Sequence, residues 1–130
     1  MTAEIKVPVS PGELIDKLTI LEIKAANITD AAKLANVNVE LKLLQETWRA
    51  SDFAKVNIDA EWKQLRDINK QLWDIEDDIR DKEREKKFDQ EFIELARAVY
   101  VTNDQRAAVK KVINTKLGSK IVEEKSYAKY

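Results

Sequence analysis

The stretch VSPGELIDKLTILEIK, residues 9–24, decides the fold of this chain. Ser10 as N-cap, Pro11 at the first helical position and Glu13 three residues after the cap form a capping box. In this motif the Ser10 hydroxyl accepts a hydrogen bond from the Glu13 amide, and the Glu13 carboxylate accepts one from the Ser10 amide. The sequence therefore predicts a helix that begins at Pro11, and it gives Glu13 a structural role before any chemical one.

Apolar side chains follow this cap at helical spacing. Leu14, Leu18 and Leu21 recur at alternating steps of four and three residues, which is typical of a packed helix face. Three further apolar residues lie off that face, namely Ile15, Ile20 and Ile23. Because this helix is apolar around much of its circumference, we expect it to be the central helix and to contact more than one neighbour.

Residues that commonly cap helices divide the rest of the chain. They are Thr29-Asp30 for a second helix, Asn57 or Asp59 for a third that includes the charged run DDIRDKEREKK, Asp89 for a fourth, and Thr102 or Asn103 for a last helix ended by Gly118. The opening run EIKVPVS contains Pro8, so an extended arm or an edge strand is expected there. The prediction is a single all-α domain, residues 1–130: an antiparallel bundle of about four to five helices with a short extended N-terminal arm.

Composition limits the chemistry. The 130 residues include no His and no Cys, and 23 basic and 24 acidic side chains give a net charge of −1. The usual zinc sites, and Ser-His-Asp or Cys-His catalysis, are thereby excluded. A net charge near zero gives no general attraction to nucleic acid or an anionic membrane, and no membrane span or signal peptide is recognised. We expect a cytoplasmic protein without nucleic-acid or membrane partners.

Basic and aromatic side chains form the preferred candidate site, because Arg and Lys beside a helix N-terminus can bind an anion. We expect a non-catalytic binding protein for a small anionic ligand (a nucleotide or a sugar phosphate) or for a protein partner, with no cofactor; whether the chain is an enzyme is left open. The candidate ligand-binding residues are Lys17, Lys24, Arg80, Arg97, Tyr100, Asn103, Arg106, Lys125 and Tyr127. Replacing Arg97 or Arg106 by Ala should abolish binding. Ordinary surface ion pairs are the competing interpretation.

Two alternative functions use other residues. Carboxylates on two helices can hold Mg²⁺, which would make the chain a magnesium-dependent nucleotide phosphohydrolase. The metal-binding candidates are Glu13, Asp16, Asp77 and Asp78. The competing interpretation is a capping residue and a solvated, charged helix end. The second alternative is a homodimeric helical interaction module that uses surfaces around Ile23 and Trp73.

Four blocks of the sequence resemble a small family of uncharacterised bacterial and phage proteins, a domain of unknown function. The blocks are VPVSPGELIDKLTILEIK, LWDIEDDIRDKE, FIELARAVYVTNDQRAAVKKVIN and SKIVEEKSY. The resemblance implies a domain that stands alone, and it implies no particular activity. Because the blocks come from both ends of the chain, we expect them to share a polar pocket if the tail with VEEKSY folds back over the first helix.

Overall fold

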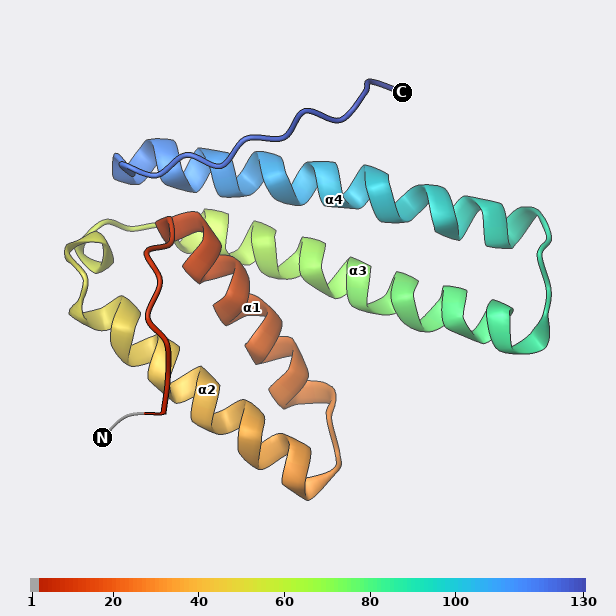
Figure 1. The fold of residues 1–130 in the computed structure, drawn as a ribbon, viewed down its shortest axis with the longest axis horizontal. Helices are drawn as coiled ribbons and strands as arrows, with labels where there is room; N and C mark the ends of the chain where they lie inside the picture. The colour runs from red at the N-terminus through yellow and green to blue at the C-terminus, as the bar shows by residue number, and fades with distance from the viewer. Residues whose placement is uncertain (1–2) are drawn as a thin grey trace.

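The computed structural model describes residues 3–130 and is all-α. Its elements are α1 (Pro11–Asn27), α2 (Ala31–Ala50), the short 3-10 helix η1 (Asp52–Lys55), α3 (Asp59–Glu85) and α4 (Gln90–Leu117). α1 and α2 form one antiparallel hairpin and α3 and α4 form another, and the tips of the two hairpins point apart (Figure 1). The predicted helical bundle is confirmed. Within the described residues, no helix is both long and apolar enough to cross a membrane.

Side-chain caps fix three of the helix starts where the sequence predicts them. Each capping oxygen accepts a hydrogen bond from the backbone amide three residues further on, and the caps are Ser10, Asp30 and Asp89. At α3 the arrangement is different. The Asn57 carboxamide accepts a hydrogen bond from the Asp59 amide at 2.9 Å, while Ile58 occupies the N-cap position.

One local expectation is wrong. α4 is one continuous helix of 28 residues, so no separate helix begins at Thr102 or Asn103. Thr102 is buried in the middle of this helix, and the packing of α4 against α1 and α3 outweighs the weak helix propensity of Thr and Asn. Residues 3–10 contain no helix or strand, which excludes the edge strand and leaves the arm, the other of the two alternatives for this segment. The end of α4 is as expected, because Gly118 adopts the left-handed conformation at φ 67°.

The apolar core lies where the beginnings of α1 and α3 meet the end of α4. Its buried members are Leu14, Ile15, Leu18, Ile58, Leu65, Ile113 and Leu117. α1 contacts α2, α3 and α4, which confirms it as the central helix. α2 has no buried residue and covers the core with partly buried side chains, among them Leu41, Leu44 and Trp48.

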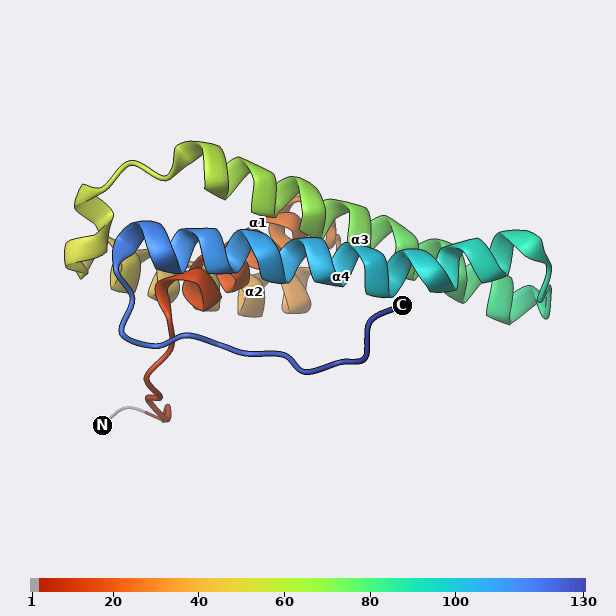
Figure 2. The same cartoon turned by 90° about the horizontal axis from the view of Figure 1, so that it is seen from above.

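The C-terminal tail, residues 119–130, contains no helix and runs back along α4 (Figure 2). Its first anchor is Glu123, whose carboxylate accepts a hydrogen bond from the Ser10 hydroxyl at 3.1 Å. Its second anchor is Tyr130, whose hydroxyl donates to the Asp104 carboxylate at 2.6 Å. The tail therefore links the beginning of α1 to the outer surface of α4.

Candidate functional site

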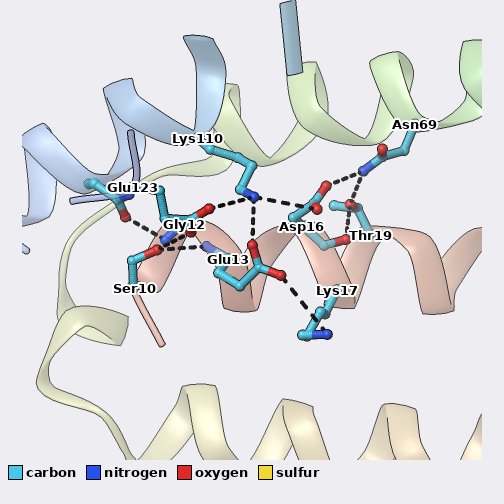
Figure 3. A network of polar contacts seen from close by, with 10 residues as sticks. Ser10, Gly12, Glu13, Asp16, Lys17, Thr19, Asn69, Lys110 and Glu123 are labelled. Carbon is cyan, nitrogen blue, oxygen red and sulfur yellow. Dashed lines mark hydrogen bonds and ion pairs between the residues drawn. The ribbon is translucent and has the colours of Figure 1, made fainter. Parts of the chain in front are cut away.

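The first turn of α1 and the second half of α4 meet in a polar network around Lys110 (Figure 3). The Lys110 ammonium lies 2.5 Å from the Glu13 carboxylate, 3.4 Å from Glu123 and 3.9 Å from Asp16. Only 16% of the Lys110 side chain is exposed. One half-buried cation therefore binds three carboxylates that come from α1 and from the tail.

The capping box at the start of α1 is half formed. The Glu13 amide donates to the Ser10 hydroxyl oxygen at 3.2 Å, as predicted. The Glu13 carboxylate contacts Lys110, and Lys17 lies 3.9 Å away on its other side. The hydroxyl of Ser10 in turn donates to Glu123. The capping residues thus join α1 to α4 and to the tail as well as starting the helix.

The opposed charges shift two pKa values. Burial lowers the pKa of Lys110, but the hydrogen bond to Glu13 and the charges of Asp16, Glu13 and Glu123 raise it above its ordinary value. Burial raises the pKa of Glu123, but the Lys110 charge and the Ser10 hydroxyl bring it below its ordinary value. Both groups are therefore charged at neutral pH, and their ion pair holds the tail in place.

Gly12 allows α1 to approach α4 closely. Its amide donates to the Asn114 carboxamide oxygen at 2.7 Å. A Cβ atom at this position would lie 2.6 Å from the Lys110 carbonyl oxygen, which is too short for any side chain. This contact sets the distance between the two helices and so positions the carboxylates of α1 beside Lys110.

A second polar cluster extends from Asp16 towards α3. Asn69, which is 4% exposed, donates through Nδ2 to the Asp16 carboxylate at 2.8 Å and to the Thr19 hydroxyl oxygen at 2.9 Å. The Thr19 hydroxyl donates to the Asp16 carbonyl at 2.8 Å. Because Asp16 also faces Lys110, one network connects α1, α3 and α4.

Two grooves adjoin this network, and a third shares Lys125 with one of them. The tail groove, of about 360 Å³, lies between α4 and the tail; its charged lining consists of Arg106, Lys110, Lys111, Glu123, Glu124 and Lys125. The hairpin groove, of about 470 Å³, lies between α1, α3 and α4 and is lined by residues that include Ile20, Asn69, Trp73, Asn103 and Arg106. The third, of about 750 Å³, lies under the end of the tail and includes Tyr100 and Tyr127. Arg106 lines both the tail groove and the hairpin groove.

The structure divides the predicted ligand-binding residues into two sets. Those that line one of the three grooves are Arg80, Tyr100, Asn103, Arg106, Lys125 and Tyr127. Lys17, Lys24 and Arg97 line none of these grooves. Lys17 pairs with Glu13, and Arg97 is exposed on α4.

The predicted metal-binding carboxylates lie in different places. Glu13 and Asp16 face Lys110. Asp77 lines the hairpin groove, and Asp78 is exposed on α3. Across residues 3–130, no group of three acidic side chains lies close enough together to hold a metal ion.

The sequence of residues 5–130 matches the profile of a family described as Family of unknown function (DUF6165). The chain belongs to this family. Searches of curated proteins and of solved structures gave no match. The match to DUF6165 includes all four α-helices, and with them the residues of α1, α4 and the tail that form the Lys110 network. The predicted membership of a domain of unknown function is therefore confirmed.

Sequence analysis of this DUF6165 chain missed the buried amides of the network and did not include Lys110 among the candidate ligand-binding residues. Asn69 and Asn114 are buried amides that hold helices together. The one local signal is that each directly follows a core residue, Ile68 or Ile113. A polar side chain beside an apolar helix face indicates a buried hydrogen bond but does not identify its partner.

Proposed function

We propose that this DUF6165 chain is a non-catalytic protein that binds a small anionic ligand, a nucleotide or a sugar phosphate, in the tail groove. The supporting observation is that Arg106, Lys111 and Lys125 all line this groove, and none of them forms an ion pair with another part of residues 3–130. Lys110 lines it too, but three carboxylates already balance its charge. The free cations of the groove outnumber its one free carboxylate, Glu124.

The chemistry of these three cations suits a phosphate group. Arg106 is half-buried, and its planar guanidinium can donate two parallel hydrogen bonds to phosphate oxygens. Lys111 and Lys125 are exposed and approach from opposite walls, one from α4 and one from the tail. A volume of about 360 Å³ falls within the range of small-molecule sites.

The proposal includes no reaction because three of the carboxylates at or beside the groove already have a partner, which leaves Glu124 as the one free carboxylate. Glu13, Asp16 and Glu123 all face Lys110. A general base must reach the proton that it removes, and an ion-paired carboxylate is held elsewhere. Binding without catalysis is therefore the function that this arrangement favours.

The test is calorimetric titration with nucleotides and sugar phosphates, with and without Mg²⁺. Arg106→Ala should weaken binding roughly 10- to 100-fold, because a charge-assisted hydrogen bond contributes about 1.5–3 kcal/mol. Arg97→Ala is the matched control: the same residue type is removed from the same helix, outside the grooves, and affinity should not change. Unchanged affinity in Arg106→Ala would exclude the tail groove, and Mg²⁺-dependent phosphate release would favour the hydrolase instead.

A further inference from the structure

We infer that the hairpin groove holds the base of the ligand, so that the ligand is a nucleotide whose base carries an exocyclic amine. This inference rests on the proposed function, which places the phosphate in the tail groove. Arg106 lines both grooves, so a single ligand can reach from one to the other past this side chain. The two grooves differ in chemistry: the hairpin groove combines apolar walls and a buried amide with the charged side chains of Glu76, Asp77, Arg80 and Arg106, whereas the tail groove is mainly cationic.

The orientation of the Asn69 amide is fixed by its neighbours. The Asp16 carboxylate only accepts hydrogen bonds, and the Thr19 hydroxyl already donates its one hydrogen bond to the Asp16 carbonyl. Asn69 must therefore point its NH₂ group at both of them, which is the arrangement observed (Figure 3). Its carbonyl oxygen lies on the opposite side of the amide and accepts no hydrogen bond from any residue in the range 3–130.

This unpaired oxygen belongs to a residue that is 96% buried and that lines the hairpin groove. The oxygen is not fully enclosed by protein, and as an acceptor without a protein donor it makes the groove complementary to a ligand that brings an N–H group. An exocyclic amine of a base is such a donor. A sugar phosphate without a base has hydroxyl groups but no flat amine-bearing ring.

Apolar side chains form the walls beside this acceptor. Trp73 and Leu72 on α3 and Ile20 on α1 are half-buried, and each lines the groove. Trp73 lies off the main apolar stripe of α3, so the groove gives a reason for an aromatic residue at this position. A planar base can stack on the indole ring while its edge reaches Asn69.

Polar groups at the rim complete the fit. Asn103 and Arg106 lie on the α4 side of the groove, and both can donate to ring nitrogen atoms. On the α3 side Arg80 is 3.2 Å from Glu76, so its charge is balanced there. Arg106 is therefore the unpaired cation nearest the base and the natural link to the phosphate.

The experiment compares four probes by calorimetry on the full chain: AMP and CMP, which carry the amine, purine riboside 5′-monophosphate, which lacks it, and ribose 5-phosphate, which lacks the base. We expect AMP or CMP to bind at least about fivefold more tightly than ribose 5-phosphate, the lower end of stacking on an aromatic side chain. Purine riboside 5′-monophosphate should lie between them, because it stacks but leaves Asn69 unpaired.

Trp73→Leu should lower the affinity for AMP towards that for ribose 5-phosphate. The affinity for ribose 5-phosphate itself should not change. Trp73→Phe keeps an aromatic ring and should retain most of the wild-type affinity for AMP. Equal affinities for all four probes in the wild-type chain would overturn the base site while leaving the anion site intact. If no probe binds at all, the proposed function fails, and this inference fails with it.

Discussion

Gly12 lies at a point of close approach between α1 and α4. An added Cβ would meet the Lys110 carbonyl oxygen at 2.6 Å, and that atom belongs to the backbone of a long helix. A flexible side chain could move away from such a contact, but a helix backbone moves only together with its packing. The close approach is therefore a requirement of the fold and not a local detail.

Gly12→Ala should lower the free energy of unfolding, although Ala favours helix more than Gly by about 1 kcal/mol. We expect a net loss of about 1–3 kcal/mol from overpacking, measured by urea denaturation. Gly118→Ala is the comparison: its φ of 67° costs about 1–2 kcal/mol, yet no atom lies within 4 Å of the added Cβ. Only Gly12→Ala should also disturb the chemical shifts of the Lys110 network. A Gly12→Ala chain as stable as the wild type would contradict this packing.

Among the helices, α2 depends most on interactions within its own sequence, such as its N-cap. It has no buried residue, so tertiary packing contributes less to it than to α1. Its start is fixed by Asp30, whose carboxylate accepts a hydrogen bond from the Lys33 amide at 2.9 Å. A helix held this way is sensitive to its cap.

Asp30→Ala should destabilise the chain by about 1 kcal/mol, the usual contribution of an N-cap side chain. For a domain of this size the melting temperature should fall by about 3–5 °C. Asp30→Asn is the control, because its side-chain oxygen can still accept the hydrogen bond, and its melting temperature should stay near that of the wild type. If the melting temperatures of both variants fall by the same amount, the negative charge at the helix N-terminus, and not the cap hydrogen bond, stabilises the start of α2.

At the scale of the whole molecule, the tail is held by contacts between distant parts of the sequence. Glu123 meets Ser10 and Lys110, and Tyr130 meets Asp104. No helix or strand forms in residues 119–130, so these side-chain contacts decide where the tail lies. Since Arg106 and Lys111 lie beneath it, the tail also decides whether the tail groove has a second wall.

The tail should be released by acid. The pKa of Glu123 is lowered in the folded state, so its ion pair stabilises the tail at neutral pH and is lost as the pH falls through that lowered value. Lys110, with a raised pKa, stays charged throughout that change. NMR shifts of residues 119–130 recorded from pH 7 to pH 3 should report the release. Glu123→Gln should show a loosened tail already at pH 7; a wild-type-like tail in that variant would refute the anchor.

Local interactions explain which features the sequence determined by itself. The caps Ser10, Asp30 and Asp89 and the end at Gly118 depend on residues within one turn, so pattern and spacing were enough to place them. The central position of α1 followed from its apolar circumference. The prediction of a helix start at Thr102 was wrong because this residue is buried within a continuous helix, where packing outweighs its preference for a cap position.

Only the tertiary structure decided which charges and amides meet. Glu13 has a clear local partner in Ser10, yet its carboxylate binds Lys110, which is 97 residues away in the sequence. Asn69 and Asp16 are separated by 53 residues, and nothing in their own neighbourhoods identifies the pairing. Helix period fixes the face on which a side chain lies, but the close approach at Gly12 and the crossing of the two hairpins choose its partner. The bounds of most helices therefore follow from local sequence. The grooves and the polar network between the helices form only when the helices pack together.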